Sequence, residues 1–125
     1  MEELILKTKQ DYVNAHKKLW NWIINYMRIH KIKYNIRMKE DGYKILWSNY
    51  FSITDFCFGC LYAHDVRVDV EAHLCNTCLF DIDLQFRNED GDHCLNNLYF
   101  SLFCSTDYTN SMSIAKKIRD FPIKL

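Results

Sequence analysis

The hydrophobic pattern predicts a first long helix from about Thr8 to Ile29. Apolar side chains recur there at spacings of three, four or seven residues, as on one face of an amphipathic helix: Tyr12, Leu19, Trp22, Ile23 and Tyr26. Trp20 and Ile24 widen this apolar face, so we expect the helix to pack against a large part of the core.

After His30 the period changes to two. Apolar residues from Ile32 to Met38 alternate mostly with basic ones, which predicts a strand with one basic face. A helix that continues through Ile29, Ile32 and Ile36 fits the same positions. The run Glu40-Asp41-Gly42 then predicts a turn.

Two further segments alternate in the same way. Val66 to Ala72 and Phe80 to Phe86 predict strands, and residues 43–56 are aromatic and β-prone. Residues 94–104 are apolar and compatible with either helix or strand. A last helix is expected to start near Ser111, which can cap it, and to stop before Pro122.

The six cysteines include two pairs with the spacing of metal ligands. Fourteen residues separate the pairs, and the predicted ligands of one structural zinc ion are Cys57, Cys60, Cys75 and Cys78. His64, His73 or Cys94 can replace one of them. Cys94 and Cys104 otherwise fit buried small hydrophobic residues. A redox pair and an iron–sulfur cluster fit the spacing less well.

These patterns together predict an α+β fold in one zinc-stabilised domain over residues 1–125. It would comprise the N-terminal amphipathic helix, a zinc-knuckle β-hairpin or small antiparallel sheet, and a short C-terminal helix. The start Met1-Glu2-Glu3 has the wrong charge for a secretory signal, and no apolar run approaches the roughly 20 residues of a membrane span. We therefore expect a cytoplasmic protein with no membrane partner.

Enzymatic activity is not expected. Four cysteines would close the zinc site to substrate. A zinc deaminase needs His-x-Glu, whereas this chain has the reverse order in Glu71-Ala72-His73. The sequence shows no glycine-rich phosphate loop and no signature of a serine or cysteine nucleophile.

The charges sum to zero but are segregated along the chain. Net charge is +5 in residues 1–50, −8 in 51–111 and +3 in 112–125. A protein-binding module would use an acidic ridge formed by Asp81, Asp83, Glu89, Asp90 and Asp92. The alternative is a nucleic-acid-binding zinc-knuckle module, with Tyr34 and Tyr43 as stacking platforms between Lys31, Lys33, Arg37, Lys39 and Lys44.

Short motifs across most of the chain support the first of these classes. They are Trp20-Asn21-Trp22-Ile23, Cys57-Phe58-Gly59-Cys60-Leu61-Tyr62-Ala63, Cys75-Asn76-Thr77-Cys78-Leu79, Cys94, and the ending Ala115 to Pro122. This layout resembles a family of small uncharacterised phage zinc-knuckle proteins, although no proline follows Cys78 and the gap between the knuckles is longer.

The resemblance implies a non-enzymatic, zinc-binding phage or mobile-element accessory protein. Such a protein would bind and inhibit a host protein in the bacterial cytoplasm, as an anti-CRISPR protein inhibits a CRISPR effector. The identity of the partner and the oligomeric state are not encoded in these motifs.

Overall fold

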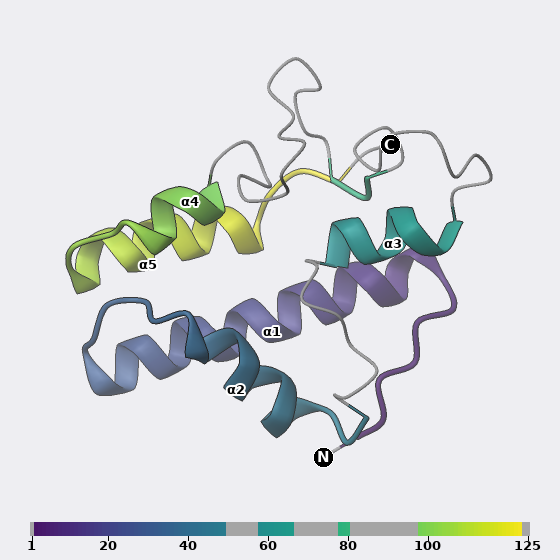
Figure 1. The fold of residues 1–125 in the computed structure, drawn as a ribbon, viewed down its shortest axis with the longest axis horizontal. Coiled ribbons are helices and arrows are strands. Elements are labelled where there is room, and N and C mark those ends of the chain that lie inside the picture. Colours follow the sequence, from purple (N-terminus) through teal and green to yellow (C-terminus); the bar gives the residue numbers. More distant parts are fainter. Residues whose placement is uncertain (1, 50–57, 67–77, 81–97, 124–125) are drawn as a thin grey trace.

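The computed structural model describes residues 2–49, 58–66, 78–80 and 98–123. The regular elements within these residues are helices (Figure 1). They are α1 (Lys9–His30), α2 (Arg37–Leu46), α3 (Phe58–Val66), α4 (Leu98–Phe103) and α5 (Tyr108–Arg119). The expected α+β class is wrong, because these residues form a mostly helical structure with isolated β-bridges and no sheet. None of the described helices combines the length and apolar character needed to cross a membrane.

α1 confirms the helix predicted from the apolar spacing. It begins after Thr8 because Thr8 and Asp11 form a capping box: the Thr8 side chain accepts from the Asp11 N–H, and the Asp11 carboxylate accepts from the Thr8 N–H. It ends where Lys31 adopts the left-handed conformation, with φ of 52°. The N–H groups of Lys31 and Ile32 both donate to the Met27 carbonyl there, which reverses the chain.

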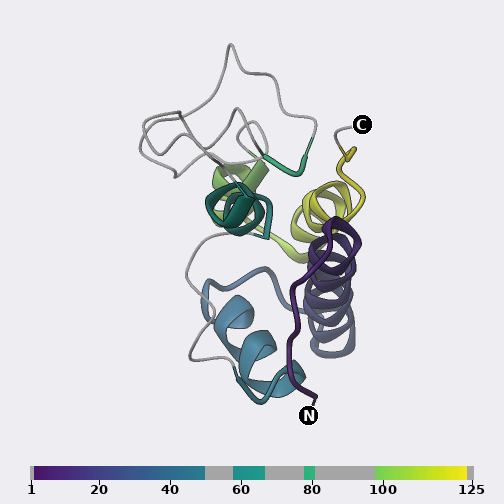
Figure 2. The same ribbon diagram turned by 90° about the vertical axis from the view of Figure 1, so that its right-hand side faces the viewer.

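The other helices are arranged around α1. α2, α3 and α5 pack against it, and α4 packs against α5. Figure 2 shows α5 running directly above α1, with α2 to its left. Trp20, predicted to be a core residue, is completely buried on this helix together with Leu19, Ile23 and Met27. The wide apolar face of α1 is therefore the centre of the described core.

His16 joins α1 to α5. Its side chain is 1% exposed, and its Nε2 lies 2.8 Å from the carbonyl oxygen of Ile118. A carbonyl can only accept a hydrogen bond, so this nitrogen carries the proton. The imidazole also packs against Phe80, with ring centroids 4.5 Å apart, and Phe80 contacts Phe121 in turn. Residues 78–80 are thereby held against the α1–α5 contact.

The strand and turn expected after His30 are wrong. Residues 31–36 form an irregular connection, and α2 begins at Arg37 and continues through the predicted turn. Met38 is buried, and the ring of Tyr34 stacks on Trp20 at 6.2 Å, whereas Ile32 and Ile36 are exposed. The alternating apolar residues therefore do not share one buried face, which a strand would require.

The C-terminal helix is confirmed, but it starts earlier than expected. Asp107 caps it by accepting a hydrogen bond from the Asn110 N–H at 2.8 Å, so the cap assigned to Ser111 is wrong. Residues 98–103 of the ambiguous segment are helical as α4. Val66 lies in α3, and Phe80 forms an isolated bridge with Ile123. The rest of both predicted strands lies outside the described residues.

Gly42 allows α2 to cross α1 closely. A Cβ atom at this position would lie 2.7 Å from Leu19 Cδ1 and 3.1 Å from Trp22 Cε3. We expect Gly42→Val to lower the free energy of unfolding by about 1–3 kcal/mol through overpacking, as measured by urea denaturation. The neighbouring exposed change Asp41→Ala is expected to stay within about 0.5 kcal/mol of the wild type. Equal stability of Gly42→Val and wild type would contradict this crossing.

Candidate functional site

The expected zinc knuckle is not supported by the structure. Its first pair would open a β-hairpin, but α3 begins at Phe58, directly after Cys57, and includes Cys60. The Cys78 side chain is 6% exposed and belongs to the core cluster with Leu79 and Phe80. In the described ranges, no group of three or more His, Cys, Asp or Glu side chains could hold a metal ion.

The remaining predicted ligands cannot be placed. Cys57, Cys75, His73 and Cys94 lie outside the described residues, as do the side chains of Cys60 and His64. The four-cysteine ligand set stays a sequence-based prediction. Cys104 was expected to be buried, but it is exposed at the end of α4.

The acidic ridge also lies outside the described residues. It comprises Asp81, Asp83, Glu89, Asp90 and Asp92. The basic residues of the alternative hypothesis are described, but they do not share a strand. Lys31 and Lys33 lie in the connection between α1 and α2, while Arg37, Lys39 and Lys44 lie on α2.

The two tyrosines expected as stacking platforms between these basic residues pack against other aromatic rings. Tyr43 is only 8% exposed and packs against Trp47 and Phe58. The ring of Tyr34 is stacked on Trp20. Lys44 pairs with Glu40 at 3.2 Å, and the Lys39 ammonium lies 5.2 Å from the centre of the Tyr99 ring. Both rings are therefore already packed against other aromatic side chains in this structure.

The exposed apolar side chains gather mainly on two other features. Phe100 and Phe103 are 48% and 63% exposed on consecutive turns of α4. Ile29, Ile32 and Ile36 are exposed at the end of α1 and in the connection that follows. Figure 1 shows this connection and the end of α4 at the same end of the molecule. Sequence reasoning missed both groups, because an apolar residue is assigned to the core by default.

A chain of buried hydrogen bonds ties the two features together. The Tyr34 N–H donates to Ser111 Oγ at 2.9 Å, and Ser111 Oγ lies 2.6 Å from Ser105 Oγ. Ser105 donates its own proton to the Leu102 carbonyl, so the proton between the two hydroxyls must come from Ser111. This series fixes the α1–α2 connection against the junction between α4 and α5.

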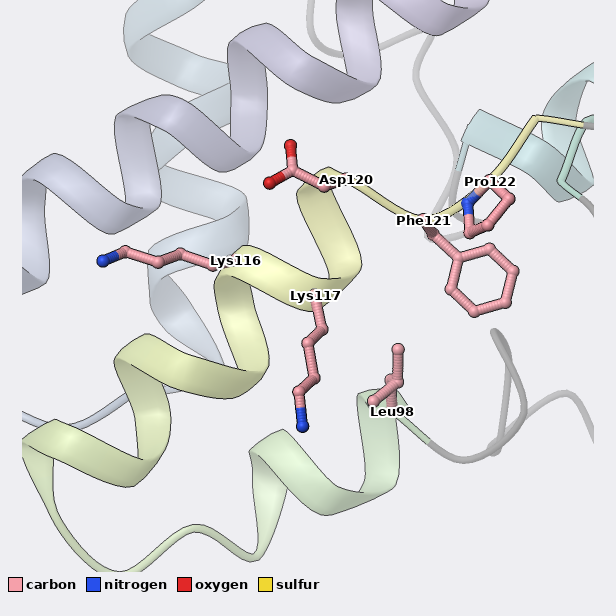
Figure 3. Close-up of a pocket in the computed structure, with 6 residues that line it drawn as sticks. All are labelled: Leu98, Lys116, Lys117, Asp120, Phe121 and Pro122. Carbon is pink, nitrogen blue, oxygen red and sulfur yellow. The ribbon is translucent and has the colours of Figure 1, made fainter.

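A shallow hollow of about 480 Å³ lies at the other end of the α4–α5 pair (Figure 3). Leu98, Phe121 and Pro122 give it apolar walls, and Lys116, Lys117 and Asp120 complete its lining. In Figure 3 the Lys117 side chain extends from α5 toward α4, whereas that of Lys116 points away in another direction. The hollow suits an apolar or acidic group of a binding partner rather than an enclosed substrate.

The Tyr12–Asp65 hydrogen bond links two helices of the described structure. Tyr12 Oη donates to Asp65 Oδ2 at 2.6 Å. Burial and the adjacent carboxylate raise the pKa of Tyr12 well above its ordinary value, so the phenol keeps its proton at neutral pH. The pair thus joins α1 to α3.

Removing the central hydroxyl of the serine series should weaken the fold. Ser111→Ala leaves the Tyr34 N–H and Ser105 without their partner, and we expect a loss of about 1–3 kcal/mol in the free energy of unfolding. Ser113→Ala, at an exposed position of the same helix, is the matched control and should change stability by less than about 0.5 kcal/mol. Similar denaturation midpoints for the two variants would show that the series is not formed in solution.

The burial of Tyr34 should make stability depend on pH in the alkaline range. Burial raises the pKa of Tyr34 from 10.0 to about 12. The unfolded chain releases this proton near pH 10, whereas the folded chain keeps it to about pH 12. The stabilisation is therefore complete below pH 10 and is lost as pH rises toward 12. Between these values the wild type should lose up to about 2–3 kcal/mol more than Tyr34→Phe, as measured by urea denaturation at each pH.

Comparisons with known proteins identify no relative of this chain. No protein-family model, no curated protein and no solved structure matches the chain. A function is therefore proposed from the helical arrangement and the two exposed apolar groups.

Proposed function

We propose that this protein is a non-enzymatic binding protein that recognises another protein through its α4–α5 face. The observation that carries the proposal is the exposure of Phe100 and Phe103, three residues apart on one short helix. Exposed phenylalanine is costly in water, and aromatic residues are enriched at the buried centres of protein interfaces. Two rings on adjacent turns can anchor in one apolar pocket of a partner.

The exposed charges on α5 indicate the chemistry of the partner. Lys116 and Lys117 are exposed on α5, and the side chain of Lys117 extends toward α4 (Figure 3). Asp120 on the same helix already pairs with Arg119 at 2.9 Å. A complementary partner surface would place an apolar pocket opposite the two rings and carboxylates opposite the lysines.

The proposal does not extend to the narrower expectations drawn from the sequence. Zinc binding has no support in the structure, because no group of ligands that could hold a metal ion is found among the described residues. Neither the fold nor the comparisons bear on a phage origin, on inhibition or on a CRISPR effector as the partner. Protein recognition is the part that the exposed α4–α5 face supports.

The test compares the double variant Phe100→Ser/Phe103→Ser with Ile45→Ser. Ile45 is 55% exposed on α2, so the control removes a similar apolar side chain from another surface. Tagged proteins are used to capture partners from lysate of the cells that encode the chain, and the affinity of a purified partner is then measured. Loss of two anchor rings should weaken binding by about 100-fold or more, with no such loss for Ile45→Ser.

Two controls keep the result interpretable. Far-UV circular dichroism and thermal melting should be unchanged in both variants, because the replaced side chains are exposed. A partner that binds the double-phenylalanine variant with wild-type affinity would show that the α4 face is not the recognition surface.

A further inference from the structure

The segment from Arg28 to Arg37 carries an exposed apolar group that differs in chemistry from α4. Its apolar members are aliphatic: Ile29 is 73%, Ile32 41% and Ile36 64% exposed. Exposed cations lie between and beside them in sequence, namely Arg28, Lys31, Lys33 and Arg37. Exposed isoleucine and basic residues are therefore interspersed along residues 28–37, which we call the Ile–Lys segment.

The Ile–Lys segment lies in a strongly basic part of the chain. From Tyr12 to Lys39 there are seven Lys or Arg residues and no Asp or Glu. Glu40, the first acidic residue after this stretch, pairs with Lys44 at 3.2 Å. The positive charge around the isoleucines is thus not neutralised by acidic residues of the same stretch.

We infer that the Ile–Lys segment docks on the surface of an anionic phospholipid membrane. In this arrangement the isoleucine side chains enter the boundary between headgroups and acyl chains, and the cations contact lipid phosphates and carboxylates. Charge complementarity selects an anionic partner. The pairing of aliphatic side chains with lysine selects lipid, because lysine is depleted in protein–protein interfaces while both groups suit a membrane boundary.

Other polyanions fit the segment less well. A nucleic acid would offer phosphates to the cations. Proteins that bind single strands, however, rely on aromatic stacking, and the Tyr34 ring already stacks on Trp20. Isoleucine side chains placed against a phosphate backbone would remain in contact with water or charge. A membrane boundary accommodates both kinds of side chain.

The backbone of the segment is held in place before any partner binds. The reversal at Lys31 is fixed by two hydrogen bonds to the Met27 carbonyl, and Tyr34 is tied to Ser111. Lys31 has a φ of 52°, a conformation that glycine or asparagine adopts with less strain. The lysine at this position thus adds charge to the surface although it is not the residue the turn favours. A pre-ordered segment loses less entropy on binding than a flexible one.

The inference is tested by co-sedimentation of the full chain with vesicles. One set is phosphatidylcholine alone, and the other contains about 30% phosphatidylserine. Wild-type protein should sediment with the anionic vesicles and not with the neutral ones, and binding should fall when salt is raised from about 0.1 to 0.5 M. Duplex and single-stranded DNA are titrated as competitors in the same buffer.

Variants separate the two kinds of contact. Ile29→Ser/Ile36→Ser should weaken vesicle binding by about tenfold or more. Lys31→Asn/Lys33→Gln should weaken it by about 25-fold, since each cation near an anionic surface contributes about fivefold. Phe100→Ser/Phe103→Ser should leave vesicle binding unchanged. Failure of the membrane inference is therefore distinguishable from failure of the proposed protein recognition.

The single variant Lys31→Asn excludes a merely structural role. It should raise the melting temperature or leave it unchanged, because asparagine tolerates the left-handed conformation, while vesicle binding falls about fivefold. A parallel fall in melting temperature would overturn the role given to Lys31. Equal binding to neutral and anionic vesicles, unaltered binding of the isoleucine variant, or displacement by DNA at lower concentration than lipid would overturn the inference as a whole.

Discussion

The burial of one wide face of α1 is the constraint on which the other described helices depend. Leu19, Trp20, Ile23 and Met27 are completely inaccessible to solvent on this 22-residue helix. α2, α3 and α5 have only 9 to 12 residues and α4 has six, lengths at which an isolated helix is marginal in water. They are stable because they pack against α1 directly or, for α4, through α5. The surfaces that remain for binding are those that this packing leaves uncovered.

The sequence predicted helices where the apolar spacing was unambiguous. α1 was predicted from its apolar stripe and α5 from an apolar spacing that stops before Pro122, whereas the capping box and the reversal that bound α1 are seen in the structure. Residues 31–38 gave two conflicting signals, because their apolar positions fit both periods. The conflict is resolved by tertiary contacts: Trp20 offers a surface on which Tyr34 stacks, while Ile32 and Ile36 face solvent. Gly42 signals a turn in sequence, yet its lack of a side chain is used for helix crossing.

The candidate surfaces were less predictable than the helices. Exposure of Phe100 and Phe103 follows from which side of α4 meets α5, and no local pattern contains that information. The contact between Ser105 and Ser111 likewise depends on the junction between two helices. The basic character of residues 31–39 was visible in the sequence, but its pairing with exposed isoleucine was hidden by the assumption that alternating apolar residues are buried. The cysteine spacing predicted four zinc ligands. Cys78 is the one whose side chain the structure describes, and it is buried in the core.

The hydrogen bond between His16 and Ile118 joins residues 102 positions apart. Because a chain emerges from the ribosome in order, α1 is made before α5. Until α5 emerges, the buried face of α1 lacks one of its main partners, and the imidazole of His16 lacks its carbonyl acceptor. Bringing together residues that lie so far apart in the sequence costs loop-closure entropy, and this cost slows folding. Between the synthesis of α1 and that of α5, the apolar surface of α1 is therefore exposed to chaperones and to aggregation.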